Sequence, residues 1–174
     1  LEFARETVRS FNYRYNTNVL IEPQMKNTEV PKVLGIDGVE KMGKSLDNHI
    51  ELAATAEETQ KRVMQMVTDP QRMRRTDPGR PEVCNVFSMH KIFSPAEQVA
   101  EIDVECRQAG IGCVDCKKRF AANLNTHLAP FREQRNELAK DMDAVQAILD
   151  DGAARARAIA EQTMIDVRAA VGLP

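Results

Sequence analysis

Residues 55–67, with the sequence TAEETQKRVMQMV, mark the point at which the chain changes from loop to helix. Thr55 and Glu58 form the capping-box pattern, in which two side chains satisfy backbone amides at the start of a helix. Asp69 comes directly before Pro70, and a residue in that position disfavours the helical conformation. The stretch therefore predicts one amphipathic helix that ends before Asp69 and buries three apolar side chains, Val63, Met66 and Val67.

Start and stop signals predict four more helices further along the chain. Pro95 and Pro130 each suit the first position of a helix, and Gly152 follows two aspartates as a stop signal. Residues 69–86 hold three prolines and should form a loop. The expected helices span 95–109, 115–128, 130–151 and 153–171. Their apolar stripes are Phe120, Leu124, Leu128, Phe131, Leu138, Met142, Val145, Leu149, Ile159, Ala160, Met164, Val167 and Val171. From residue 55 on, we expect a helical bundle joined by short loops.

The first 54 residues have a different pattern. Apolar residues at helical spacing predict a helix over residues 1–15, and prolines and glycines interrupt residues 17–54. Short apolar stretches within 17–54 are typical of loops and strand ends at the carboxyl edge of an α/β sheet. The chain opens inside a helix at Leu1, so we expect a fragment whose N-terminal part is missing.

Charge and hydropathy exclude several classes of protein. The net charge is −2, from 24 basic and 26 acidic residues, so no global field recruits a polyanion. Residues 61–80 hold six basic and two acidic side chains, which is a modest indication that this segment binds a polyanion. The alternative is a basic surface that only water contacts. No signal peptide and no membrane-spanning run of apolar residues occurs.

The stretch Lys41-Met42-Gly43-Lys44-Ser45 is the most informative candidate for chemistry. Two lysines three residues apart on a glycine-containing loop can grip a polyphosphate. The absent side chain at Gly43 would let backbone amides approach the anion. The alternative is a surface turn that carries two solvated lysines.

Four cysteines form a second constellation, with the spacing C-x21-C-x6-C-x2-C. A helix N-terminus and the basic residues 117–119 lie beside Cys113 and Cys116, and both features favour the thiolate form. Four thiolates suit zinc or an iron–sulfur cluster, and the spacing does not separate the two. Buried free thiols are the alternative. The complete set of candidate ligands is Cys84, Cys106, Cys113 and Cys116.

Residues 41–45 resemble the KMSKS signature of the class I aminoacyl-tRNA synthetases. Further segments resemble the bacterial tryptophanyl-tRNA synthetase family, in the family's order and over essentially the whole chain. These segments are Thr28–Pro31, Thr68–Gly79, Pro81–Phe87, Gly112–Lys118 and Leu128–Glu133. The resemblance implies a mostly α fold in two parts. Residues 1–54 would be the C-terminal remnant of a Rossmann-like catalytic domain, and residues 55–174 a helical anticodon-binding domain.

The resemblance also implies an activity and a site. The parent enzyme would use ATP with Mg²⁺ to activate tryptophan and would transfer it to tRNA(Trp) in the cytoplasm, without membrane association. It would form a homodimer through the missing N-terminal half. Lys44 would be the main catalytic lysine and Lys41 its partner, while Val33 and Leu34 would lie against adenine. The implied ATP-binding set is Val33, Leu34, Lys41, Met42, Gly43, Lys44 and Ser45.

The resemblance has departures and rivals. Gly43 stands where the signature has a serine, and a fragment without the family's first half should be inactive alone. For the four cysteines the resemblance favours a [4Fe–4S] cluster, with Zn²⁺ as the alternative. A tyrosyl-tRNA synthetase would share the ATP loop without explaining the cysteines. A non-enzymatic helical module that binds a metal or a partner is the rival of another class. Residues 72–75, with Arg132 and Arg135, are candidate tRNA contacts, and residues 72–75 could instead order the cysteine loop through Asp77.

Overall fold

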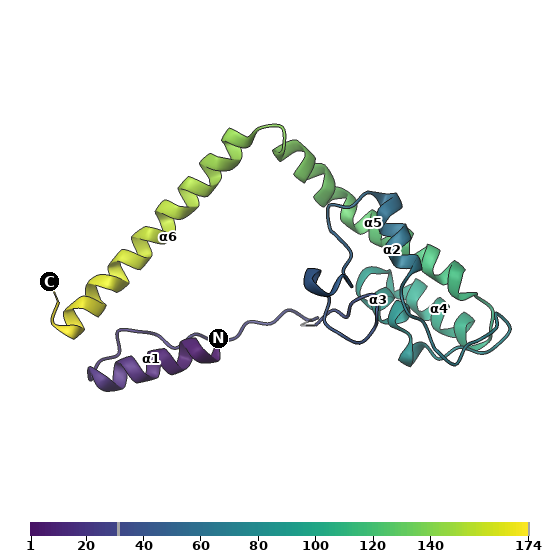
Figure 1. The fold of residues 1–174 in the computed structure, drawn as a ribbon, viewed down its shortest axis with the longest axis horizontal. Coiled ribbons are helices and arrows are strands. Elements are labelled where there is room, and N and C mark those ends of the chain that lie inside the picture. Colours follow the sequence, from purple (N-terminus) through teal and green to yellow (C-terminus); the bar gives the residue numbers. More distant parts are fainter. Residues whose placement is uncertain (31, 174) are drawn as a thin grey trace. The chain divides into compact units, whose positions relative to one another are not determined.

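The computed structural model describes residues 1–30 and 32–173, and most of them are helical (Figure 1). Within these residues no β-strand forms, and a single isolated antiparallel bridge joins Leu34 to Lys41. The α-helices are α1 (Glu2–Arg14), α2 (Ala56–Met64), α3 (Asn85–Phe93), α4 (Ala96–Arg107), α5 (Cys113–Leu138) and α6 (Met142–Val171). Two short 3₁₀ turns accompany them, η1 (Lys44–Leu46) and η2 (Pro81–Val83). The expectation of a mostly α chain is confirmed.

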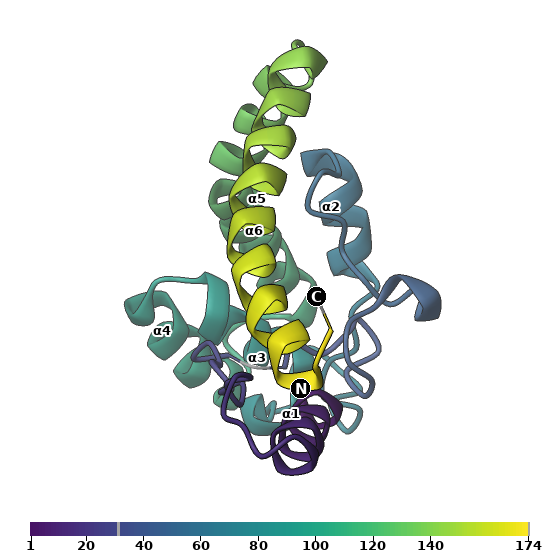
Figure 2. The same cartoon turned by 90° about the vertical axis from the view of Figure 1, so that its left-hand side faces the viewer.

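Contacts within the chain gather in two units, Leu1–Thr28 with Leu138–Pro174, and Glu29–Glu137. The second unit holds α2, α3, α4 and α5 up to Glu137. Both views of the ribbon show α3 and α4 next to one another (Figures 1 and 2). The segment with Lys41 and Lys44 belongs to this same unit. The division of function after residue 54 stays a prediction.

The core of the second unit lies among α2, α3, α4 and the first half of α5. Phe120 is fully buried, and its ring meets the His90 ring in a T-shaped arrangement with centroids 5.2 Å apart. The Nδ1 atom of the equally buried His90 lies 2.8 Å from the Ser94 hydroxyl. Other buried apolar side chains are Ile50, Val63, Met66, Val86, Phe87, Met89, Ile102, Ile111, Leu124 and Leu128.

The capping box predicted at Thr55 is confirmed. The Thr55 hydroxyl accepts from the amide of Glu58 at 3.2 Å, and the Glu58 carboxylate accepts from the amide of Thr55 at 2.8 Å. Helix α2 ends before Asp69, as expected. Val63 and Met66 are buried, but the prediction for Val67 was wrong, because the helix has ended and only the backbone amide of Val67 turns inward, to the carbonyl of Ile36 at 2.9 Å.

Two local predictions around α3 and α4 need correction. The expected loop over 69–86 contains η2 and the first two residues of α3, Asn85 and Val86. Pro95 is the N-cap of α4 rather than its first residue, and the helix ends at Arg107. It ends early because Ala109 adopts a left-handed conformation with φ of 57°, which no helix continues.

The predicted breaks in the last two helices were wrong. Helix α5 continues through Pro130, which is exposed, and α6 continues through Gly152. The break falls instead just before Asp141, whose carboxylate accepts from the amide of Ala144 at 2.9 Å and caps α6. Side chains expected to form stripes beyond Leu128 are not buried, and α6 buries no residue at all. The packed bundle therefore ends within α5.

The predicted first helix is confirmed as α1, which buries no residue. Its polar side chains hold the segment that follows it. The Asn12 carboxamide exchanges two hydrogen bonds with the backbone of Leu20, at 2.7 and 3.3 Å, and Arg9 pairs with Glu22. None of the described helices combines the length and the apolar character needed to cross a membrane.

Candidate functional site

Residues 33–42 form a short hairpin that leads into the lysine pair. The amide of Gly35 donates to the carbonyl of Glu40, and that of Met42 donates to the carbonyl of Val33, both at 2.9 Å. The hairpin turns at Gly38, whose φ of 70° lies in the left-handed region that favours glycine. The return arm then passes Lys41 and enters η1 at Lys44. We call residues 35–47 the glycine–lysine loop.

The Asn48 side chain fixes the shape of this loop through hydrogen bonds to two of its residues. Its side chain is buried, with Oδ1 accepting from the amide of Gly43 at 2.8 Å and Nδ2 donating to Asp37 at 2.6 Å. Asp37 accepts in turn from the amides of Val39 and Glu40, at 2.8 and 3.0 Å. The amide of Val39 and the Asn48 carboxamide lower the pKa of Asp37 from its usual value, so the carboxylate stays charged.

The structure brings the predicted ATP-binding residues together in one segment. Lys41, Lys44 and Ser45 are exposed, whereas Val33, Leu34 and Met42 are half-buried. One part of the chemical expectation was wrong. The Gly43 amide already donates to Asn48, so it does not point to an incoming anion. The two lysine ammonium groups remain the cations that this loop offers to a phosphate chain.

The four cysteines gather between α3, α4 and α5, and each is a free thiol. Arg72 links two of them, because its Nη1 atom lies 3.7 Å from the sulfur of Cys106 and 3.9 Å from that of Cys113. Gly79 packs directly against one of the thiols, since any Cβ there would overlap the Cys106 sulfur. The Gly79 amide also donates to the carbonyl of Cys106 at 2.9 Å.

Burial raises the pKa of these thiols. It raises the pKa of Cys116 to about 12, with the other three thiols adding to the effect. Burial likewise raises the pKa of Cys84 and Cys106, against the opposing backbone amides at Cys84 and the Arg72 charge at Cys106. The expectation that a basic environment favours the thiolate was therefore wrong for Cys116. One basic neighbour, Lys117, instead donates to the carbonyl of Met64 at 2.9 Å.

The arrangement of the cysteines is not that of a ready coordination shell. In the part of the chain that the structure describes, no three His, Cys, Asp or Glu side chains are arranged to hold a metal ion. The thiols of Cys84, Cys106 and Cys113 are still close enough for their charges to raise the pKa of Cys116. The Cys116 sulfur also lies 3.6 Å from Nε2 of His90.

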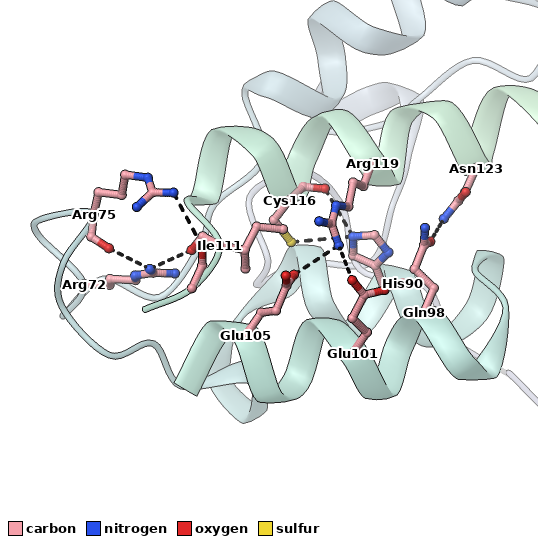
Figure 3. Close-up of polar contacts among 11 residues, drawn as sticks. Arg72, Arg75, His90, Gln98, Glu101, Glu105, Ile111, Cys116, Arg119 and Asn123 are labelled. Atoms are coloured by element: carbon pink, nitrogen blue, oxygen red, sulfur yellow. Dashed lines mark hydrogen bonds and ion pairs between the residues drawn. The ribbon is translucent and has the colours of Figure 1, made fainter. Parts of the chain in front are cut away.

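Arg72 orders the loop that carries the cysteines (Figure 3). Its Nη2 atom donates to the carbonyl of Ile111 at 2.8 Å and to that of Arg75 at 3.0 Å. Arg119, on the next turns of α5, pairs with Glu101 and Glu105 of α4 at 3.3 and 3.0 Å. Of the two roles considered for residues 72–75, Arg72 therefore performs the ordering role. It does so without Asp77, which accepts instead from the backbone amide of Arg74 at 2.7 Å.

Arg132, one of the predicted tRNA contacts, is engaged within the unit. Its guanidinium donates to the carbonyl of Leu52 at 3.1 Å, to Asn125 at 2.8 Å and to the buried hydroxyl of Thr59 at 2.8 Å. These contacts tie α5 to α2 and to the loop before it. Arg135 is exposed.

Comparison with known proteins adds to this geometry. The family model "tRNA synthetases class I (W and Y)" matches residues 1–129. A tryptophan–tRNA ligase of Aquifex aeolicus is 43% identical over 175 residues, which cover 100% of this chain and 44% of the relative. One of Thermotoga maritima is 40% identical, with 99% of this chain and 52% of the relative covered.

A solved structure shows the same likeness. Tryptophanyl-tRNA synthetase from Campylobacter jejuni, complexed with ADP and tryptophan, matches with a TM-score of 0.79 and 30% identity. The match covers 99% of this chain and 53% of that one. The chain thus spans about half the length of the relatives that it matches.

Proposed function

Because the chain belongs to the class I tRNA synthetases of the tryptophan and tyrosine family, we propose that it is the C-terminal part of a tryptophan–tRNA ligase. The whole ligase would activate tryptophan with ATP and Mg²⁺ and esterify tRNA(Trp), as a cytoplasmic homodimer whose contacts lie in the other half. The observation that carries the proposal is the glycine–lysine loop, in which Lys41 and Lys44 are exposed and whose shape Asn48 fixes.

The loop would act by bringing positive charge to the triphosphate. Lys44, with Lys41 as its partner, would contact the phosphate oxygens, while Val33 and Leu34 would contact adenine. Met42, Gly43 and Ser45 would complete the contact surface. A charge that reaches the phosphates only when a loop closes stabilises the transition state more than the bound substrate. The exposure of both lysines leaves them available for this movement.

We assign recognition of the tRNA anticodon to the helices after residue 54. The exposed Arg74 supports this assignment, because the basic segment 61–80 presents it to solvent, whereas the Arg75 guanidinium donates to the carbonyl of Gly110 at 3.5 Å. Arg72 and Arg132 are engaged with neighbouring groups, so they are not part of the assigned tRNA contact.

A hybrid ligase tests the proposed function. Residues 1–174 replace the matching segment of the Aquifex aeolicus relative, and ATP–pyrophosphate exchange is measured with tryptophan and with tyrosine. We expect exchange with tryptophan only, and loss of that exchange in the Lys44→Ala hybrid. No exchange from a hybrid that folds as well as the intact relative would contradict the proposal.

The 174-residue chain provides a readout that does not depend on the hybrid. We expect the chain to bind an anticodon stem–loop of tRNA(Trp) at least tenfold more tightly than one with a tyrosine anticodon, since single-stranded bases are read individually. The Arg74→Ala variant should bind more weakly. Equal binding of both stem–loops would contradict the assignment of the helices to anticodon recognition and would favour a non-enzymatic module.

The cysteines support a second proposal, a [4Fe–4S] site with Cys84, Cys106, Cys113 and Cys116 as ligands and Zn²⁺ as the alternative. The chemistry of the donors supports this proposal, because four unbridged thiols lie near one another and four thiolates are ligands that such a cluster or a zinc ion takes. Aminoacylation transfers no electrons, so a cluster there would hold α3, α4 and α5 in place.

Anaerobic purification followed by absorption spectroscopy and metal analysis tests the metal proposal. A brown sample with about four irons and four sulfides per chain supports the cluster. The Cys106→Ser variant should then lose the colour. A colourless protein with about one zinc per chain would replace the cluster with the alternative. A metal-free protein that keeps its fold would contradict both.

A further inference from the structure

We propose that Asn85, the first residue of α3, is a positioning residue for the glycine–lysine loop and fixes that loop to α3. The catalytic consequence rests on the proposed function, whereas the positioning itself is a property of this chain. Asn85 lies 50 residues away from its partner Gly35 in sequence. The inference depends on four contacts around one turn.

The first contact is a buried hydrogen bond. Asn85 is 6% exposed, and its Nδ2 atom donates to the carbonyl of Gly35 at 2.7 Å. The same carbonyl accepts from the amide of Gly38 at 3.0 Å, which closes the turn of the hairpin. The Asn85 carboxamide is therefore bonded to the atom on which the turn depends.

The second contact is steric. A Cβ at Gly38 would lie 3.1 Å from Cβ of Asn85, and φ at Gly38 is 70°. Any larger residue at position 38 would meet both backbone strain and the Asn85 side chain. The turn thus lies directly against the start of α3.

The opposite side of the turn is in contact with Asn48. A Cβ at Gly35 would overlap the Asn48 carboxamide, so this glycine is needed for close approach. Asn48 also accepts from the amide of Gly43, next to Lys44. The turn is consequently held between two buried carboxamides. One of them, that of Asn48, also fixes the segment that carries Lys44, through its bond to the Gly43 amide.

The Asn85 side chain acts here as a hydrogen-bond donor through Nδ2, and not as an acceptor. Its Oδ1 atom is buried and has no hydrogen-bond partner among the described residues. Burying an unpaired carbonyl oxygen costs free energy, and a packing residue of similar size would avoid that cost. Because α3 packs against α4 and η2, a displacement of α3 would reach the glycine–lysine loop through the bond from Asn85 to Gly35.

Hydrogen exchange on the full 174-residue chain tests the positioning directly. We expect Asn85→Ala to increase amide exchange across residues 38–47 by about tenfold. Asn85→Asp keeps the shape of the side chain, suits the start of a helix and lacks the donor, so it should act likewise. The matched control is Asn123→Ala, which removes an asparagine bonded to Ser94 and Gln98 and away from the loop.

Unchanged exchange over 38–47 in both Asn85 variants would overturn the inference. So would equally fast exchange there in Asn123→Ala, because the effect would then be general destabilisation. Wild-type exchange in Asn85→Asp would also overturn it, since packing rather than donation would hold the turn. None of these results depends on ligase activity, so they are separate from a failure of the proposed function.

The hybrid ligase gives the catalytic readout. If Asn85 positions the lysines for the transition state, Asn85→Ala should lower kcat for ATP–pyrophosphate exchange by about tenfold, with KM for tryptophan unchanged. Asn123→Ala should leave both constants unchanged. A rise in KM for tryptophan with unchanged kcat would contradict the positioning role.

Discussion

The guanidinium of Arg80 donates to both carboxylate oxygens of Asp69, with Nη2 2.6 Å from Oδ1 and Nε 3.1 Å from Oδ2. The Asp69 side chain is 4% exposed, and it also accepts from the backbone amides of Gln71 and Arg80 at 3.0 Å. These bonds fix the loop that joins α2 to η2. The Arg80 guanidinium holds the pKa of the Asp69 carboxyl well below its usual range.

Asp69→Asn should destabilise the chain at neutral pH, because the amide cannot accept all four donors or pair with Arg80. The folded pKa of Asp69 lies below the unfolded value of about 4. The carboxylate therefore stabilises the fold above pH 4, and this stabilisation is lost as pH falls through 4 towards the folded pKa. Calorimetric unfolding between about pH 3 and pH 7 should show a flatter acid limb in the variant.

Glu82→Gln is the control for this pH dependence. Glu82 pairs with Arg107 at 3.0 Å, but its side chain is 56% exposed, so solvent screens the pair. We expect its unfolding curve to follow that of the wild type at every pH. An acid limb of unchanged slope in Asp69→Asn would show that the Asp69 pair does not set it.

Two glycine-to-alanine substitutions should change local stability in opposite directions. Gly35→Ala should destabilise the glycine–lysine loop, because its Cβ would overlap Asn48. Gly152→Ala should stabilise α6 by about 0.5–1 kcal/mol, since nothing lies within 4 Å and glycine is a poor helix former. Hydrogen exchange of loop and helix amides measures both effects. Equal effects of the two variants would contradict the close approach at Gly35.

Arg132→Ala should lower the free energy of unfolding by about 2 kcal/mol, because it leaves Thr59 and the carbonyl of Leu52 without their donor. Arg135→Ala is the matched control on the same helix, and it should change stability by less than about 0.5 kcal/mol because Arg135 is exposed. Calorimetry compares the two variants. Equal stability of both would show that the Arg132 network contributes nothing.

The lysines should affect the reaction without affecting the fold. In the hybrid ligase, Lys44→Ala should lower kcat for adenylate formation about 10²-fold, and Lys41→Ala should lower it less. Neither change should shift the unfolding temperature, because both side chains are exposed. Lys61→Ala, which removes an exposed pair with Glu57, is the charge control. Normal kcat after loss of both loop lysines would exclude the mechanism.

Local signals in the sequence predicted the parts of the fold that local energetics decide. The capping box at Thr55 and the stripe of Phe120 were predictable because a cap and a helical period involve residues a few positions apart. Pro130 and Gly152 misled the prediction for the opposite reason. Pro130 costs helix stability about 3 kcal/mol and Gly152 about 1 kcal/mol, and the long helices that contain them form despite these costs.

The site could be predicted only in part. The lysine loop and the four cysteines follow from spacing and resemblance, and the structure brings each group together. Asn48 and Asn85 gave no such signal, and Arg132 was predicted as a tRNA contact rather than as a structural residue, because their roles depend on partners as many as 80 residues away in sequence. A buried asparagine next to a glycine pair is evident only once the two segments are placed in contact.

The exposed helices also decide how the chain can be studied. The chain has no tryptophan, and its two tyrosines, Tyr13 and Tyr15, lie at the end of α1, 91% and 42% exposed. Ellipticity in the far ultraviolet sums all the helices, and it includes the signal of α6, the longest helix described, which buries nothing. Tyrosine fluorescence therefore reports on α1 rather than on the core around Phe120. Far-ultraviolet ellipticity combines the exposed helices α1 and α6 with the helices α2–α5 of the core unit, so melting curves from the two probes describe different parts of the chain.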